Sequence, residues 1–126
     1  MVEEYRVKVY RNRTEWRNLE GKMHRLDGPA IEYSDGYKAW WVNGQLHRID
    51  GPAVEYSEGN KEWWVNGKLH RVDGPAVEWS NGIKEWFIEG EEFTEDEFKR
   101  KVNPIKELTV EDISNLLGYE VKIVKS

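Results

Sequence analysis

The chain has 126 residues, of which 34% are charged and 38% hydrophobic, with a formal net charge of −5 and no cysteine. This composition is typical of one folded domain, and it excludes disulfides, thiol catalysis and cysteine-rich zinc sites. No run approaches the roughly 20 apolar residues of a membrane-spanning helix, and the acidic balance argues against nucleic acid or an anionic membrane as a partner.

Residues 1–20 are predicted to form a hairpin that caps one end of the fold. Tyr5, Val7 and Val9 alternate with polar residues, as on a strand, and a turn follows at residues 11–13. Glu15 and Trp16 repeat the later pair Glu62 and Trp63, which indicates a degenerate half-repeat. The first residues lack the basic and apolar regions of a signal peptide, so we expect a cytoplasmic location.

A block of 23 residues then occurs three times without a gap, at 21–43, 44–66 and 67–89. The second and third copies are identical at 15 of 23 positions. A unit this short cannot bury a core alone, so the period predicts stacked repeats. The chain is therefore expected to be one mainly β domain, a meandering antiparallel sheet of stacked β-hairpins.

Glycine turns divide each copy into two short strand-forming segments. Asn43-Gly44 and Asn66-Gly67 predict two-residue hairpin loops, in which both central residues need positive φ. The Asp-Gly-Pro strings at 27–29, 50–52 and 73–75 predict a bend between hairpins, because proline cannot donate a hydrogen bond to a strand ladder.

Charge predicts the pairing of the strands. A three-residue loop at the second turn of each copy places unlike charges opposite each other, whereas a two-residue loop would oppose glutamates. The predicted pairs are Glu32 with Lys38, Glu55 with Lys61, and Glu78 with Lys84. Across the Asn-Gly turns, the expected pairs are Trp41 with Leu46, Trp64 with Leu69, and Glu62 with Arg71.

Alternation along the strands separates two faces. The face expected to form the core carries Ile31, Tyr33, Trp41 and Leu46, repeated as Val54, Tyr56, Trp64 and Leu69. The other face is predicted to bind a partner, because exposed tryptophans are common interface anchors; its candidate residues are Trp40, Trp63, Trp86, His47, His70, Lys38, Lys61 and Lys84. Alternatively, these tryptophans lie over Ala30, Ala53 and Ala76 and complete a second packed layer.

The string His-Arg-x-Asp occurs at 24–27, 47–50 and 70–73. Histidines on successive hairpins, roughly 10 Å apart, cannot share one ion at about 2.0–2.1 Å, so no metal site is predicted. The preferred interpretation pairs each arginine with a nearby carboxylate. The alternative is that Arg25, Arg48 and Arg71 bind phosphate groups.

Residues 90–126 are predicted to form a helix–helix–strand cap. Thr94 and Glu97 make a capping box for a helix that runs to about Val102. A second helix is expected from Leu108 to Leu117 with Gly118 as its stop, followed by a strand over 119–125.

The repeated strings resemble those of MORN repeats (membrane occupation and recognition nexus), and more closely the MORN-like tandem repeats of small phage and bacterial proteins. The likeness rests on the 23-residue period and on the sequence at 50–67, which runs from Asp-Gly-Pro-Ala to Val-Asn-Gly. It implies a meandering antiparallel sheet used for protein contacts, with dimerisation possible. In place of the usual Gly-x-Gly after histidine, this chain has Arg-x-Asp-Gly-Pro.

Together these features predict a non-enzymatic protein without catalytic residues or cofactors, because every candidate acid or base is repeated equally. The resemblance implies a phage-encoded accessory protein that blocks a bacterial defence or host factor by binding it. The alternative function is a module that binds a nucleotide, a phosphate or a glycan through the tryptophans and the arginine and histidine rows.

Overall fold

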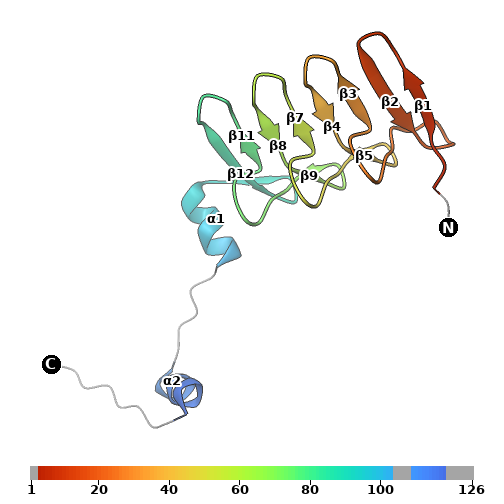
Figure 1. The fold of residues 1–126 in the computed structure, drawn as a ribbon. Helices are drawn as coiled ribbons and strands as arrows, with labels where there is room; N and C mark the ends of the chain where they lie inside the picture. The colour runs from red at the N-terminus through yellow and green to blue at the C-terminus, as the bar shows by residue number, and fades with distance from the viewer. Residues whose placement is uncertain (1–2, 104–108, 119–126) are drawn as a thin grey trace.

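The computed structural model describes residues 3–103 and 109–118, and the chain is mainly β, as predicted. Nine strands form one antiparallel sheet in the order β1-β2-β3-β4-β7-β8-β11-β12-β13, and two further hairpins pair β5 with β6 and β9 with β10 (Figure 1). The strand bounds are β1 Arg6–Val9, β2 Arg13–Arg17, β3 Ile31–Tyr33, β4 Lys38–Ala39, β5 Trp41–Val42, β6 Gln45–Leu46, β7 Val54–Glu55, β8 Lys61–Glu62, β9 Trp64–Val65, β10 Lys68–Leu69, β11 Val77–Glu78, β12 Lys84–Ile88 and β13 Glu91–Phe93.

The predicted pairing of unlike charges is confirmed in every repeat. Glu32 pairs with Lys38, Glu55 with Lys61, and Glu78 with Lys84. The pairing also continues between repeats, where Lys38 faces Glu55 and Lys61 faces Glu78. One row across the sheet therefore alternates in charge, and we call it the charge ladder.

The two-residue Asn-Gly turns are also confirmed. Asn43 and Asn66 have φ of 48° and 50°, and the glycines that follow have φ of 80° and 76°. Trp41 and Leu46 face each other across the first turn, and Trp64 and Leu69 across the second.

The same turn occurs a third time, at Glu89 and Gly90, where the sequence offers no Asn-Gly signal. Glu89 has φ of 49°, and Ile88 pairs with Glu91 across the turn. Strand β13 therefore completes the third repeat, whose hairpin extends into the segment predicted to be the C-terminal cap.

The predicted pair of Glu62 with Arg71 is wrong. Glu62 pairs with Val54 and Val77 in the main sheet. Strands β9 and β10 form a separate two-stranded hairpin. The pairing across their turn therefore does not continue to Glu62, which belongs to the main sheet.

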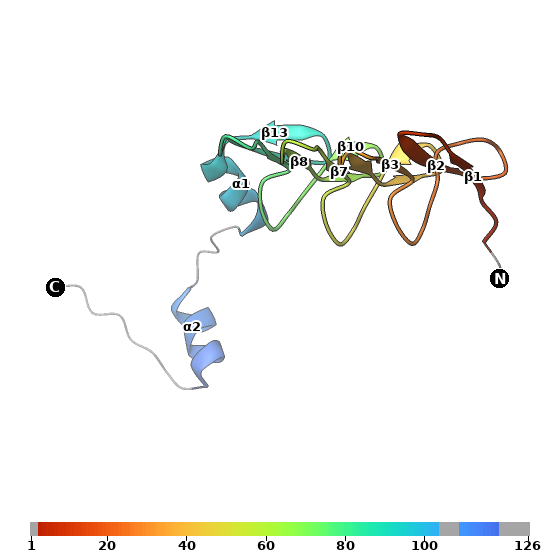
Figure 2. The same ribbon diagram turned by 45° about the horizontal axis from the view of Figure 1, so that its top comes forward.

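The buried residues are mostly small. Ala30, Ala39, Ala53 and Ala76 are fully buried, and Val54, Val77 and Phe98 are almost fully buried. Of the face predicted to be the core, only Val54 is buried in this way; Ile31, Tyr33, Tyr56, Trp41, Trp64, Leu46 and Leu69 all keep partial exposure. The sheet is seen edge-on as a thin slab in Figure 2, and no second sheet covers that face in the described part of the chain.

Both ends carry the predicted caps in outline. Strands β1 and β2 form the N-terminal hairpin, with Val7 facing Trp16. Helix α1 (Glu95–Val102) begins at a capping box of Thr94 and Glu97 and buries Phe98, and it packs against β12 and β13.

Helix α2 (Val110–Leu117) has Thr109 as its N-cap, so it begins two residues later than predicted, and Gly118 caps its C-terminal end with φ of 75°. It buries none of its residues. The strand predicted over 119–125 lies outside the described residues. Among the described residues, no helix is long and apolar enough to cross a lipid bilayer.

Candidate functional site: the loop face

Three loops of identical design project from one side of the slab (Figure 2). They are residues 24–29, 47–52 and 70–75, each reading His-Arg-x-Asp-Gly-Pro. We call this side the loop face. Helix α1 lies on the same side at the β13 end, and the N-terminal segment lies at the β1 end.

An arginine fixes the shape of each loop. The Nε–H groups of Arg25, Arg48 and Arg71 donate to the aspartate two residues later at 2.8, 3.0 and 2.9 Å. Their Nη1 groups donate to the carbonyl of the loop proline at 3.3, 3.0 and 3.0 Å. The hydrogen bond from Arg25 holds the pKa of the Asp27 carboxyl below its usual value.

The same guanidinium groups stack on tryptophan rings. Their central carbons lie 3.8 Å from the ring centre in Arg25–Trp16 and Arg48–Trp40, and 3.9 Å in Arg71–Trp63. Cation–π contacts of this kind contribute about 0.5–2 kcal/mol each. The preferred interpretation of the arginines, pairing with a nearby carboxylate, is therefore confirmed, and the stacking on tryptophan is an addition that the sequence did not indicate.

The glycine of each loop is required by this arrangement. A Cβ atom at Gly28, Gly51 or Gly74 would lie 2.8–2.9 Å from the guanidinium carbon of the loop arginine. At that distance the guanidinium group would have to leave its position. Glycine therefore leaves room for the arginine to lie flat between the loop backbone and the tryptophan.

Each loop histidine holds the hairpin turn that begins at the last residue of its own repeat. The Nδ1 atoms of His24, His47 and His70 accept the backbone N–H groups of Asn43, Asn66 and Glu89 at 2.9, 3.0 and 2.9 Å. An accepting Nδ1 carries no proton, so the neutral ring has its proton on Nε2. Each histidine therefore presents an N–H donor at Nε2.

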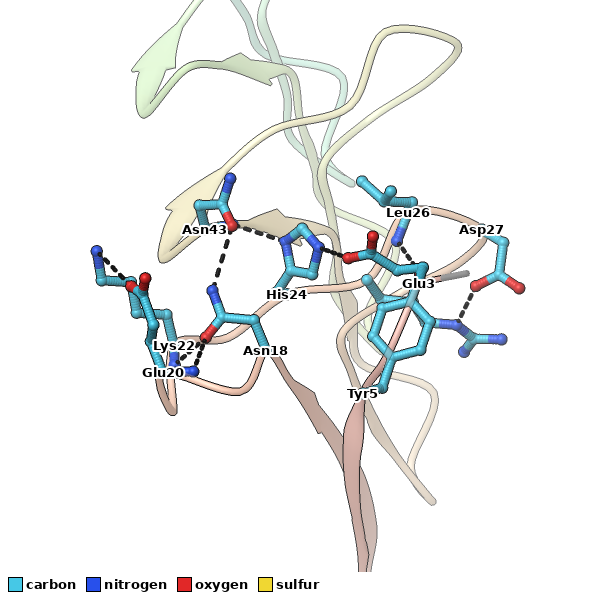
Figure 3. Close-up of polar contacts among 10 residues, drawn as sticks. Glu3, Tyr5, Asn18, Glu20, Lys22, His24, Leu26, Asp27 and Asn43 are labelled. Carbon is cyan, nitrogen blue, oxygen red and sulfur yellow. Dashed lines mark hydrogen bonds and ion pairs between the residues drawn. The ribbon is translucent and has the colours of Figure 1, made fainter. Parts of the chain in front are cut away.

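At the first loop, the N-terminal segment meets this donor (Figure 3). His24 Nε2 lies 2.7 Å from a carboxylate oxygen of Glu3, and the Leu26 backbone N–H donates to the Tyr5 hydroxyl at 3.1 Å. The Tyr5 ring meets Trp16 edge to face, with centres 5.2 Å apart and planes at 80°. His24 is consequently almost fully buried.

The second and third loops each border an open groove. One groove of about 690 Å³ lies between the first and second loops, and one of about 560 Å³ lies between the second and third. Trp40 and His47 line the first groove, and Trp63 and His70 line the second. The tips of the loops are apolar and exposed: Leu26, Ile49 and Val72 are 61%, 77% and 56% accessible.

The structure brings together most of the predicted partner-binding residues, but not all. Trp40, Trp63, His47 and His70 line the two grooves. Lys38, Lys61 and Lys84 belong to the charge ladder. The ladder and the loops share a face, because Arg71 Nη1 also lies 3.2 Å from Glu78 of the ladder.

Trp86 is separate from the other two tryptophans. It pairs with Phe93, which stands where the other repeats have histidine, and Thr94 of the helix cap stands where they have arginine. The three tryptophans that stack on loop arginines, here called the tryptophan–arginine series, are therefore Trp16, Trp40 and Trp63, and Trp86 is not one of them. Fully buried Ala30, Ala53 and Ala76 accompany the series, since their carbonyls accept the N–H groups of Trp16, Trp40 and Trp63.

The opposite face carries a tyrosine cluster. Tyr37 lies between Tyr33 and Tyr56, with ring centres 5.6 and 5.5 Å apart, and these rings line an open groove of about 570 Å³ with Trp41. Burial, and the carboxylate of Glu62, raise the pKa of Tyr56 to about 12 and also raise that of Tyr37. Glu62 accepts hydrogen bonds from Tyr56 and from the Trp64 indole N–H.

In residues 3–103 and 109–118, no group of three or more histidine, aspartate or glutamate side chains is placed to hold a metal ion. Comparison with known proteins gives no match: no family model, no curated protein and no solved structure is similar to this chain.

Proposed function

We propose that this chain is a non-enzymatic repeat protein that binds another protein across its loop face. The observation that carries the proposal is the row of three exposed apolar loop tips with a groove between each neighbouring pair. Leucine, isoleucine and valine at such tips are poorly hydrated, so covering them with a partner is favourable by about 25 cal/mol per Å² of apolar surface.

The rigidity of the loops supports this function. Each arginine is held by an aspartate, a proline carbonyl and a tryptophan ring, so the tip that follows it is fixed before any partner arrives. Binding to a surface that is already ordered avoids much of the entropy loss that weakens association. Identical loops on successive repeats would engage one partner at several points.

The loop residues serve structure in a way that favours binding over catalysis. Each histidine uses Nδ1 to hold a hairpin turn, and each aspartate pairs with its arginine. An activated nucleophile or a tuned acid–base pair is usually singular and asymmetric within a protein. Here the same groups recur with the same partners in successive repeats.

The MORN-like sequence pattern suggests which kind of protein the partner is. We propose a phage-encoded accessory protein that acts in the cytoplasm of a bacterial host and blocks a defence or host factor by covering it. The repeat sheet would supply the geometry, and the loop tips the contacts.

Affinity capture tests this proposal. The tagged chain is incubated with bacterial lysate, and bound proteins are identified by mass spectrometry. The matched variant replaces Leu26, Ile49 and Val72 with serine. The control variant replaces three other exposed residues with serine, Val9, Leu19 and Ile83, which lie outside the loops. A stoichiometric partner lost only with the loop variant is expected; equal retention by both variants would contradict binding at the loop face.

The tyrosine cluster favours a second candidate function, the binding of a nucleotide or a glycan. Flat rings beside an open groove of about 570 Å³ can stack on a base or a sugar. A change in intrinsic fluorescence on titration with nucleotides or oligosaccharides, abolished by Tyr37→Ala, is the expected result for this alternative. No response to either ligand class would rule it out.

A further inference from the structure

We propose that the grooves at His47 and His70 each bind an extended acidic peptide segment with the pattern Glu-x-Tyr. The chain's own Glu3-Glu4-Tyr5 already fills the equivalent place beside His24. The inference deepens the proposed function, on which it rests, by naming the chemistry of the partner segment.

The occupied site defines three contacts that a ligand makes. The Glu3 carboxylate accepts from His24 Nε2, the Tyr5 hydroxyl accepts from the Leu26 backbone N–H, and the Tyr5 ring packs edge to face on Trp16. The Tyr5 ring also lies 5.9 Å from the His24 ring. One short segment thus engages a side-chain donor and a backbone donor, which Figure 3 shows, and the aromatic surface of Trp16.

The other two loops offer the same three groups. The backbone N–H groups of His24, His47 and His70 donate to the backbone carbonyls of Trp16, Trp40 and Trp63 at 3.0 Å in each case, so each histidine keeps its place beside the tryptophan. The bound Nδ1 atoms of His47 and His70 direct a proton to Nε2, as in His24. Ile49 and Val72 stand where Leu26 stands.

These groups are free at the second and third loops. In the described part of the chain, the Nε2 atoms of His47 and His70 and the backbone N–H groups of Ile49 and Val72 have no protein partner. Both histidines line the open grooves, together with Ile49 and Val72. The grooves therefore present two donors beside an aromatic ring, and the preceding loop forms the opposite wall of each groove.

The local charges suit a carboxylate with a tyrosine better than a phosphate. Arg48 and Arg71 already have aspartate partners at 2.9–3.0 Å and carbonyl partners at 3.0 Å. The aspartates thereby neutralise the charge of these arginines. The histidine Nε2–H remains as a free donor, which suits a carboxylate with its single negative charge. At the first loop, the Tyr5 phenol ring packs edge to face on Trp16. A phosphate has no ring that could make this contact.

The test is a titration of the isotope-labelled full chain with a capped peptide of residues 2–6, Val-Glu-Glu-Tyr-Arg, followed by ¹H–¹⁵N spectra. We expect the amide signals of Ile49 and Val72 to shift, with two peptides bound per chain, while Leu26 is unaffected because its site is filled. The peptide is taken to about 5 mM, enough to detect a Kd near 1 mM. Absence of shifts at Ile49 and Val72 would overturn the proposal.

Matched peptides and a matched chain sharpen the result. Peptides with glutamine for Glu3 or alanine for Tyr5 should bind at least about tenfold more weakly, since the first weakens one of the three contacts and the second removes two. In the chain variant with Glu3→Gln and Tyr5→Ala, the Leu26 amide should also shift and the stoichiometry should rise to three. Inorganic phosphate giving the same shifts as the peptide would contradict the choice of ligand.

The outcome separates this inference from the proposed function. The peptide should displace the partner captured from lysate. A partner that depends on the loop tips but is not displaced by the peptide would leave the proposed function in place and overturn the Glu-x-Tyr assignment. Concentration-dependent self-association that is lost in the Glu3→Gln, Tyr5→Ala chain would identify a second copy as the source of the segment and support the assignment.

Discussion

The guanidinium of Arg48 lies 3.8 Å above the ring of Trp40, eight residues earlier in the chain. The same arginine closes its own loop through Asp50 and Pro52. One side chain thus connects the loop to a tryptophan of the sheet. In a sheet that has no second layer among the described residues, it covers a ring that such a layer would otherwise cover.

Replacing Arg48 with alanine should lower the free energy of unfolding by about 1–3 kcal/mol, because a cation–π contact and two hydrogen bonds are lost. Arg48→Lys should have an intermediate effect, since lysine keeps the charge but cannot donate in a planar fork. Urea denaturation followed by tryptophan fluorescence measures both. Arg11→Ala, at an exposed turn, is the control, and equal midpoints for Arg48→Ala and Arg11→Ala would refute the structural role.

A double-mutant cycle tests why glycine occupies position 51. Gly51→Ala alone should destabilise the protein by about 1–3 kcal/mol, because its Cβ would lie 2.9 Å from the Arg48 guanidinium carbon. In the Arg48→Ala background the same change should have little effect, because the obstructed group is gone. Additive losses, measured by urea midpoints of the four proteins, would show that the two residues do not interact.

Reversing one charge in the charge ladder should destabilise the sheet. Glu55 faces Lys38 on one side and Lys61 on the other. Glu55→Lys would place three lysines abreast and is expected to lower stability by about 1 kcal/mol at low salt and by less at 1 M salt. Glu58→Lys, in an exposed turn of the same repeat, is the control. A loss that salt does not reduce would argue against an electrostatic cause.

The raised pKa of Tyr56 predicts a loss of stability at alkaline pH. The phenol has a reference value of 10.0 and titrates at about 12 in the fold, because burial and Glu62 disfavour its charged form. The folded state therefore holds the proton more tightly, so this contribution is complete below pH 10 and is lost as pH rises from 10 to 12. Tyr56→Phe should remove this part of the pH dependence in denaturation series, while Tyr10→Phe should retain it. Parallel curves for Tyr56→Phe and the unmodified chain would contradict the assignment.

The strand register was predictable because local sequence carries it. The turn glycines fix the loop lengths, and the alternation of glutamate with lysine makes one pairing favourable and its neighbour unfavourable. The capping box of α1 was equally legible, since Thr94 and Glu97 meet within one helical turn.

The sequence predicted the strand register better than it predicted which face of the sheet is buried. Alternation says which residues share a face, but only the tertiary structure says whether a second layer covers it. Trp41 and Tyr56 were therefore expected in a core that the described sheet does not form. The arginine–tryptophan stacking and the Glu3–His24 contact join residues across bends, 8 to 21 positions apart, and no periodic signal marks such pairs.

Successive repeats are joined by one set of contacts used three times. Gly44, Gly67 and Gly90 donate to the carbonyls of Met23, Leu46 and Leu69, and the histidine Nδ1 bonds recur at the same interval. A junction between any two units is therefore equivalent to any other. Removal or duplication of residues 44–66 in frame would preserve every junction, so the length of the coding sequence would set the valency of the protein in steps of one groove.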